Sequence, residues 1–160
     1  MLKEIEIIKM PRLGLVKLTE ELTIEQLNKI PAGFNNNIAW NLAHMIAAQQ
    51  GVFYKRAGLD TVVPEDFFIT YKPETKPDKF IDNAQLETIK GLFLSTIDQL
   101  EIDIKNNLFI NYTPWTTRYG VELNNVNDAL KFLPFHDGLH VGYIWALRRA
   151  VSPPNPMKGE

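Results

Sequence analysis

Apolar residues recur every three or four positions in four segments of the chain, and this period predicts four amphipathic helices. The third segment shows the period best, and Asp82 is placed to cap it. Its apolar stripe consists of Leu86, Ile89, Phe93, Ile97, Leu100 and Ile104. The first segment covers residues 2–22 and contains Pro11, which lacks a backbone N–H. We therefore expect either one kinked helix or two shorter helices there.

The second and fourth long helices are predicted from the residues at their ends. The second begins within the asparagine run 35–37 and continues to Ala57, where Gly58 is suited to a helix stop. The fourth begins at residue 124 or 125, both asparagines, and ends near Ala150.

Two shorter segments also carry local signals. Thr23 and Gln26 have the spacing of a capping box, which opens a short helix that must stop near Pro31. Residues 108–123 are irregular and rich in aromatic side chains, and we expect a short hairpin that packs against the end of the helices.

The longest connection, residues 58–81, lies between the second and third helices. We expect it to contain no regular helix, because it is interrupted by Pro64, Pro73 and Pro77. It also carries three aromatic residues, Phe67, Phe68 and Tyr71, which make it a candidate lid over a site. Connections of this length in small domains are usually functional or serve as crossovers.

Four amphipathic helices with one long crossover are typical of an all-α four-helix bundle. We expect one domain over residues 1–150, followed by a disordered tail over the proline-rich residues 151–160. Ligand sites in such bundles are built from side chains on facing helices, so functional residues are expected on those faces.

Composition narrows the functions that this fold could support. The 160 residues include no cysteine, which excludes thiolate nucleophiles and cysteine-ligated zinc and leaves nitrogen and oxygen as metal ligands. With 17 Lys and Arg against 19 Asp and Glu, the chain offers no basic field for nucleic acid. No apolar run has the length of a signal peptide or a membrane span. We therefore expect a cytoplasmic protein that binds neither nucleic acid nor membrane.

The three histidines fall on two of the predicted helices, His44 on the second and both His136 and His140 on the fourth. A separation of four residues places His136 and His140 one turn apart on one face, where two imidazoles can bind one metal ion. Both replace hydrophobic residues in the apolar stripe of their helix, and polar groups placed there need partners. Small residues share the face of His44, and we expect them to form the floor of a cavity: Ala47, Ala48 and Gly51.

Each of these residues also has a purely structural interpretation. A single core histidine is more often a hydrogen-bonded packing residue than a ligand, and this holds for His44 alone, whereas the three together favour a metal site. Asn41 and Tyr143 are candidate auxiliary groups that could equally serve packing, and Trp40 is expected in the core.

The segment His136-Asp-Gly-Leu-His140 also approaches the HExxH motif of zinc peptidases. Asp137 is one methylene shorter than the required glutamate, and no histidine follows His140 to supply a third ligand. We therefore disfavour a peptidase and expect Asp137 to be exposed or to support a ligand from behind.

Two motifs carry a resemblance to a known family. These are Asn-Leu-Ala-His-Met-Ile-Ala-Ala around His44 and His136-Asp-Gly-Leu-His140-Val-Gly. Through these motifs the chain resembles the DinB/YfiT-like family of metal-binding helical bundles. The resemblance covers residues from Leu2 to about Ala150. The resemblance implies a four-helix bundle of up-down-down-up topology in which His44, His136 and His140 bind a divalent metal ion.

The resemblance implies a reaction only loosely, because characterised relatives include transferases and an isomerase that use a low-molecular-weight thiol such as bacillithiol or mycothiol. The leading hypothesis is a metal-dependent thiol S-transferase with a small-molecule substrate. A metal-dependent hydrolase and a non-catalytic ligand-binding or structural bundle are the alternatives. Zinc or nickel is the expected cofactor, with manganese or iron as alternatives, and a homodimer is compatible with this class.

Overall fold

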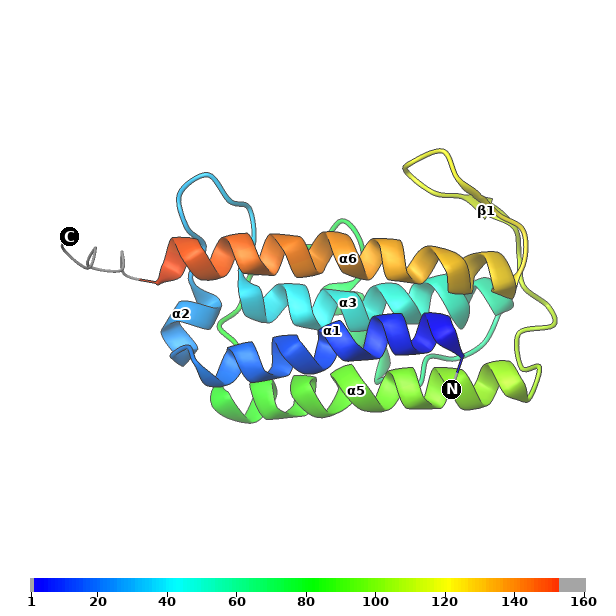
Figure 1. The fold of residues 1–160 in the computed structure, drawn as a ribbon, viewed down its shortest axis with the longest axis horizontal. Coiled ribbons are helices and arrows are strands. Elements are labelled where there is room, and N and C mark those ends of the chain that lie inside the picture. Colours follow the sequence, from blue (N-terminus) through cyan, green and yellow to red (C-terminus); the bar gives the residue numbers. More distant parts are fainter. Residues whose placement is uncertain (1, 153–160) are drawn as a thin grey trace.

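The structure is a computed structural model that describes residues 2–152, and it is mostly helical, with six α-helices packed together. The elements in chain order are α1 (Lys3–Glu20), α2 (Ile24–Asn28), α3 (Ile38–Phe53), the 3-10 helix η1 (Lys55–Ala57), α4 (Glu65–Tyr71), α5 (Asn83–Lys105), β1 (Trp115–Thr116), β2 (Glu122–Leu123) and α6 (Val126–Val151). The four long helices α1, α3, α5 and α6 lie side by side (Figure 1).

The helix caps predicted from the sequence are confirmed. The side chain of Asn37 accepts a backbone hydrogen bond at the start of α3, and that of Asn125 does the same for α6. Asp82 opens α5 with a capping box. Thr23 and Gln26 form the predicted capping box of α2. Each cap satisfies backbone N–H groups that have no partner within the first turn of a helix.

Two of the long helices differ from the prediction in detail. α1 is one helix that continues through Pro11, so the alternative of two shorter helices is wrong. α3 ends at Phe53, and one turn of 3-10 helix carries the chain to Gly58. Gly58 has a φ of 70°, the left-handed conformation that favours glycine, so the predicted stop is confirmed.

The two connections expected to be irregular contain secondary structure. Within residues 58–81, α4 occupies the seven positions 65–71, which corrects the expectation of no regular helix there. Pro64 occupies the N-cap position, where a missing N–H disturbs no helical hydrogen bond, so the helix fits before Pro73. The predicted hairpin is present, with Trp115 of β1 opposite Leu123 of β2 in an antiparallel pair.

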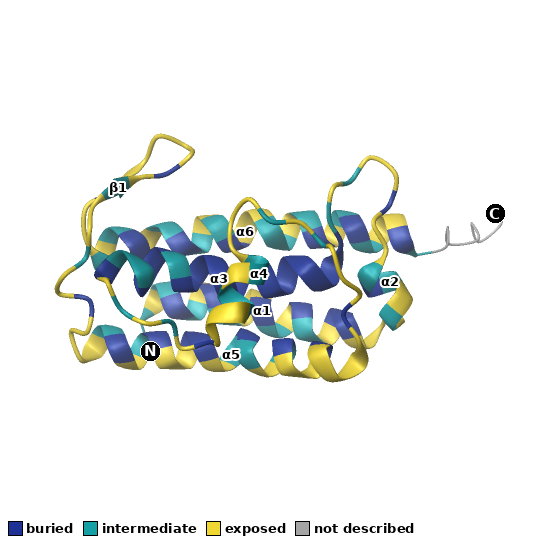
Figure 2. Cartoon of the chain, turned by 180° about the vertical axis from the view of Figure 1, so that it is seen from behind, coloured by how far each residue is buried: buried dark blue, intermediate teal, exposed yellow. Residues whose placement is uncertain are grey.

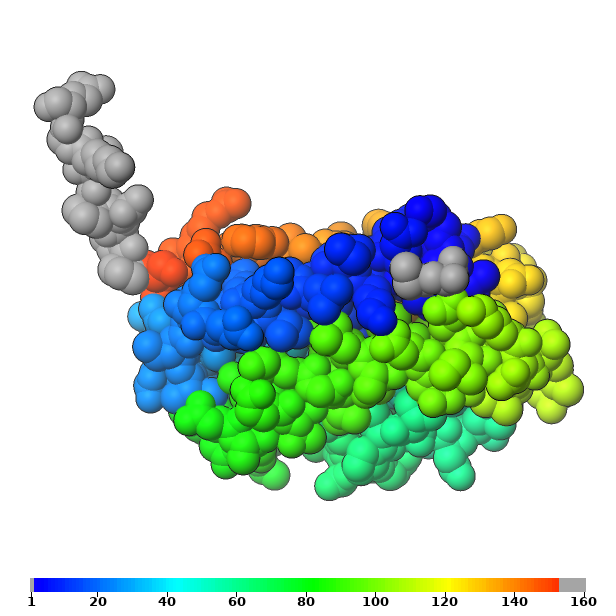
Figure 3. Space-filling model, turned by 60° about the horizontal axis from the view of Figure 1, so that its bottom comes forward, coloured from blue at the N-terminus to red at the C-terminus, as the bar shows by residue number. Residues whose placement is uncertain are grey.

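Each long helix packs against two others, which produces the bundle. α1 and α3 both contact α5 and α6. Figure 3 shows α1 flanked by α5 and α6, with side chains filling the surface between them. The hairpin contacts α6 through β2 and projects from one end of the bundle (Figure 1).

The bundle core is divided by a layer of polar residues. One apolar cluster includes Leu15, Phe93 and Ile144, and the other includes Ile8, Ile97 and Leu133. Between them lie four buried polar side chains, one from each long helix and joined by hydrogen bonds, and we call these four the polar layer: Arg12, Gln49, Thr96 and Asp137. Buried polar groups need hydrogen-bond partners, so this layer marks a specific arrangement of all four helices.

No helix within residues 2–152 is long and apolar enough to cross a membrane. The tail predicted to be disordered, residues 151–160, lies outside the described residues from position 153 onward.

Candidate metal centre

The three histidines lie together in the structure. One potential ligand atom from each of His44, His136 and His140 lies within 4.8 Å of the other two. His44 is buried on α3, and the pair on α6 is half-buried, with ring centroids 4.7 Å apart across one helical turn. Among residues 2–152, no carboxylate joins this cluster of potential ligands.

His44 is held in one orientation by two contacts. Its Nδ1 atom lies 2.8 Å from the carbonyl oxygen of Tyr71 at the end of α4. Because a carbonyl can only accept a hydrogen bond, Nδ1 carries the proton and Nε2 keeps the lone pair that a metal needs. The indole of Trp40 stacks on the imidazole, with centroids 4.7 Å and planes 11° apart. Trp40 is buried, as expected, and it fixes the plane of His44.

His140 is oriented by an asparagine on α3. Its Nδ1 atom lies 2.9 Å from Oδ1 of Asn41. The amide nitrogen of Asn41 donates to Oδ1 of Asn36 at 2.8 Å and to the carbonyl oxygen of Asn37 at 2.7 Å, which turns its oxygen toward His140. His140 therefore also presents an unprotonated Nε2. Of the two candidate auxiliary groups, Asn41 contacts a site histidine directly, and such partners raise ligand basicity.

His136 has a different neighbour. Its Nδ1 atom lies 3.6 Å from Oδ1 of Asp137, slightly beyond hydrogen-bond length. Within the described part of the chain, both atoms are buried and have no hydrogen-bond partner. The other carboxylate oxygen of Asp137 accepts a hydrogen bond from Nε of Arg12 at 2.8 Å. A small rotation of the imidazole would bring His136 into contact with a carboxylate that is already fixed from behind.

Arg12 is the residue that the sequence analysis missed. It lies on α1 with no exposed surface, and its guanidinium reaches the other three long helices. Nη1 donates to Oε1 of Gln49 at 3.2 Å and to the carbonyl oxygen of Phe93 at 3.0 Å, and the Phe93 ring lies 4.7 Å from the guanidinium carbon. One signal was available: Arg12 follows Ile8 by four residues on the buried stripe of α1.

Burial changes the protonation of the site. It lowers the pKa of His44 to about 4 and that of His140 to about 3, because an apolar environment disfavours the charged imidazolium. The neighbouring His136 lowers both pKa values further. Burial alone would raise the pKa of Asp137, but the positive charge of Arg12 holds it below its ordinary value. At neutral pH the imidazoles of His44 and His140 are therefore neutral, and the carboxylate of Asp137, beside His136, is ionised.

The fully buried stripe of α6 differs from the prediction only at the level of the histidines. It passes through Leu133, Asp137 and Ile144, whereas His136 and His140 lie at its edge. The centre of the bundle at this level is filled by the Arg12–Asp137 pair. The histidines instead face sideways, toward a surface cavity between α3 and α6. Of the two alternatives for Asp137, exposure is wrong, because the residue is buried.

This cavity has a volume of about 1050 Å³ and contains the three histidines in its wall. Ala48 and Gly51 line it as predicted, whereas Ala47 is buried in the core. Gly51 leaves room for Phe68 of α4, whose ring would lie 3.6 Å from an added Cβ. The segments before α3 and after α4 rise with the hairpin on the same side of the bundle (Figure 2), and each contributes to the wall.

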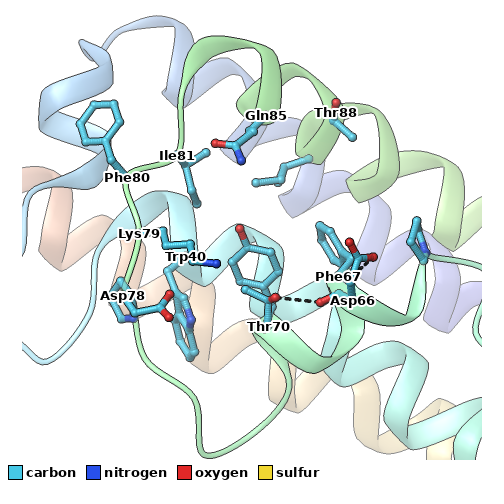
Figure 4. A pocket seen from close by; sticks show the side chains of 14 residues that line it. Trp40, Asp66, Phe67, Thr70, Asp78, Lys79, Phe80, Ile81, Gln85 and Thr88 are labelled. Carbon is cyan, nitrogen blue, oxygen red and sulfur yellow. Dashed lines mark hydrogen bonds between the residues drawn. The ribbon is translucent and has the colours of Figure 1, made fainter.

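A second cavity of about 350 Å³ lies on the other side of α4. Figure 4 shows its lining from α4, from the segment that leads to α5 and from α5 itself, with Trp40 at one side. It contains no histidine, and Trp40 lines both cavities. Trp40, which stacks on His44, therefore separates the histidine cluster from this smaller space.

A helical bundle with three converging histidines at a cavity is the class of protein that the fold and site define. The chain matches the DinB superfamily over residues 12–144, a range that includes all three histidines and the Arg12–Asp137 pair. The protein therefore belongs to the DinB superfamily. No curated protein matches the chain with significant similarity. Family membership defines the fold and leaves the reaction to be argued from the site.

Proposed function

We propose that His44, His136 and His140 bind one divalent metal ion and that the protein is a metal-dependent enzyme of the thiol S-transferase type. The observation that carries this proposal is the convergence of three imidazoles, within 4.8 Å of one another, on a cavity wall. Two of them are neutral near pH 7 and have their Nδ1 atoms hydrogen-bonded, so that Nε2 is free to bind.

The donor set fits zinc or nickel best among the ions considered. Imidazole nitrogen suits these borderline ions, while manganese prefers oxygen ligands. Bound by three imidazoles, such an ion would keep a position open and lower the pKa of a thiol or water there. Glu65, which could have closed that position from α4, is instead bound to Lys55, with Oε2 2.8 Å from Nζ.

The residues around the site support a transferase in three ways. The chain has no cysteine, so a thiol nucleophile must arrive with a cosubstrate. The cavity is large enough for two small molecules. α4 is tied to the site through the carbonyl of Tyr71, so this segment screens His44 from solvent. A low-molecular-weight thiol and a small-molecule electrophile are therefore the partners that we propose.

The order of the helices belongs to the same proposal. Figure 1 supports an up-down-down-up bundle, because α1 and α6 run in one direction and α3 and α5 in the other. This order places α3 beside α6 and so brings His44 opposite the pair on α6.

Metal analysis of protein purified without an affinity tag tests the proposal. About one zinc or nickel ion per chain is expected, and His136→Ala and His140→Ala should each lose it while keeping their helical circular dichroism. Leu139→Ala is the matched control, because Leu139 lines the same cavity between the two histidines and is no ligand. Failure of the unaltered protein to take up zinc at neutral pH would contradict the proposal, and loss of folding in the single variants would indicate a structural site.

A further inference from the structure

The cavity that holds the three histidines has an unbalanced positive charge. Lys55, Arg56 and Arg118 line it, against a single carboxylate, Glu74, although the chain as a whole has a net charge of −2. Lys55 is already paired with Glu65. Within residues 2–152, neither arginine forms an ion pair, so two guanidinium groups remain at the cavity wall for a ligand.

Arg118 is carried by a turn whose backbone is fixed. Thr117 and Gly120 close the tip of the hairpin, with the N–H of Gly120 2.9 Å from the carbonyl oxygen of Thr117. Gly120 has a φ of 78°, which favours glycine, and the N–H of Thr117 donates to the carbonyl oxygen of Val121 at 2.9 Å. Arg118 therefore occupies a defined position at the tip.

An aromatic contact holds this tip beside the site. The ring of Tyr119 packs edge-on against that of Phe135 on α6, with centroids 5.2 Å apart. Tyr119 follows Arg118 in the chain, and Phe135 precedes His136. This contact places the turn that carries Arg118 near one end of the histidine cluster, and the charge of Arg118 contributes to the lowered pKa of both His44 and His140.

Arg56 is held at the base of the hairpin. Its guanidinium lies over the ring of Trp115, 4.4 Å from the centroid, and its carbonyl oxygen accepts a hydrogen bond from the N–H of Thr113 at 2.7 Å. An arginine stacked by its face keeps the N–H groups at its edge available for a planar anion. Trp115 therefore positions Arg56 without using its donors.

We propose that the molecule bound in this cavity is an anion with an apolar body, and that Arg118, with Arg56, binds its carboxylate or phosphate group. This inference rests on the proposed function, since it names the class of substrate or cosubstrate for the same site. The apolar body would contact the aromatic wall of the cavity, which consists of Trp40, Phe68, Trp115, Tyr119, Phe132 and Tyr143. Arginine is the side chain best suited to bind such an anion, because its planar guanidinium can donate two parallel hydrogen bonds to a carboxylate or a phosphate.

Isothermal titration calorimetry with three small probes tests the inference. Benzoate and phenyl phosphate carry the two anionic groups, and benzyl alcohol is a neutral molecule with the same ring. Both zinc-loaded and metal-free protein are titrated, since the metal-free form excludes direct binding of the anion to the metal ion. We expect at least one anion to bind about tenfold tighter than benzyl alcohol in both forms, and the stronger of the two identifies the group.

Substitution then assigns the effect to one residue. Arg118→Gln should weaken binding of the preferred anion about five- to tenfold. Arg118→Lys should weaken it less, because lysine keeps the positive charge but cannot donate two parallel hydrogen bonds. Arg149→Gln is the matched control, because it removes the same charge from an exposed position on α6 outside the cavity. Equal weakening in the Arg149 variant, equal affinity for benzyl alcohol, or no binding of either anion would overturn the inference.

Zinc uptake, measured on the same samples, separates the two proposals. Zinc bound without any preference for anions would overturn this inference alone. A preference for anions that Arg118→Gln removes, in a protein that takes up no zinc, would overturn the metal proposal alone.

Discussion

Nε of Arg12 on α1 lies 2.8 Å from Oδ2 of Asp137 on α6, in the polar layer that separates the two apolar clusters. Asp137 is next to His136 in the chain, and its second oxygen faces the imidazole of that residue at 3.6 Å. A side chain from the first helix is therefore linked through one carboxylate to the candidate metal centre on the last.

Arg12→Met should destabilise the protein strongly. Removing one partner of a buried ion pair leaves the other charge buried and uncompensated, at a cost of about 3–5 kcal/mol. Urea unfolding of the metal-free protein measures this loss. Arg149→Met, at an exposed position, is the control and should change the free energy of unfolding by less than about 0.5 kcal/mol. A loss below about 1 kcal/mol in Arg12→Met would contradict a structural role for the pair.

The double variant Arg12→Met/Asp137→Leu separates stability from metal binding. Apolar side chains of similar volume can replace a buried ion pair at little cost, so most of the lost stability should return. Zinc affinity should nevertheless stay about 10- to 100-fold below that of the unaltered protein, because His136 no longer faces a carboxylate. Full recovery of both stability and zinc affinity would show that Asp137 does not support metal binding by His136.

The elements with both a periodic stripe and a cap could be predicted from the sequence. The sequence predicted α5 from its apolar stripe and from the cap at Asp82. It also predicted the start of α3 at Asn37, because capping is a local interaction. α4 was missed because Pro64 and Pro73 suggested an irregular segment. A helix of seven residues fits between them because Pro64 takes the N-cap position, which is a local effect, and because the helix packs against α3, which is a tertiary contact.

The histidine cluster could be predicted because its three members are rare residues at a metal-binding spacing, but its supporting residues could not. Arg12 lies among charged residues on an amphipathic helix, and such an arginine usually faces solvent. Only the packing of α1 against α6 shows that the carboxylate of Asp137 lies opposite the guanidinium of Arg12. Because Asp137 takes the buried position of α6 at this level, the histidines lie in the wall of a surface cavity and not at the predicted centre of the bundle.

Asn41→Leu should weaken zinc binding while preserving the fold. Leucine has a similar volume but cannot accept the proton on Nδ1 of His140, so the imidazole loses the contact that fixes its tautomer. A decrease in zinc affinity of about 10- to 100-fold is expected. The control is Asn127→Leu, at an exposed position in the first turn of α6. Competition with a zinc chelator measures both affinities, and equal values in the two variants would contradict the role of Asn41.

The metal-free protein should lose stability as the pH falls from about 6.5 to about 4. The pKa values of His44 and His140 are lowered from 6.5 to about 4 and about 3 in the folded state, so the unfolded chain binds more protons throughout that window. Their contribution to stability is complete above pH 6.5, and the total loss is of the order of a few kcal/mol. Urea unfolding at several pH values, with a chelator present, measures it.

His140→Gln is the comparison variant for this pH dependence. A glutamine amide can still donate a hydrogen bond to Asn41 but does not titrate, so the free energy of unfolding should vary less with pH between 6.5 and 4. The same slope in the variant and the unaltered protein would assign the effect to other groups.

A small thiol such as 2-mercaptoethanol, added to the cobalt-substituted protein, should produce a sulfur-to-metal charge-transfer band in the near ultraviolet. Three imidazoles leave a tetrahedral ion one open position, and within residues 2–152 no carboxylate joins the cluster to fill it. The chain has no cysteine, so a thiolate band can come only from the added molecule. His140→Ala, which should lose the ion, is the control without a band. Binding of azide with no response to any thiol would favour the hydrolase alternative, because water would then be the nucleophile. A spectrum that responds to no added ligand would indicate a closed coordination sphere and a structural role for the three histidines.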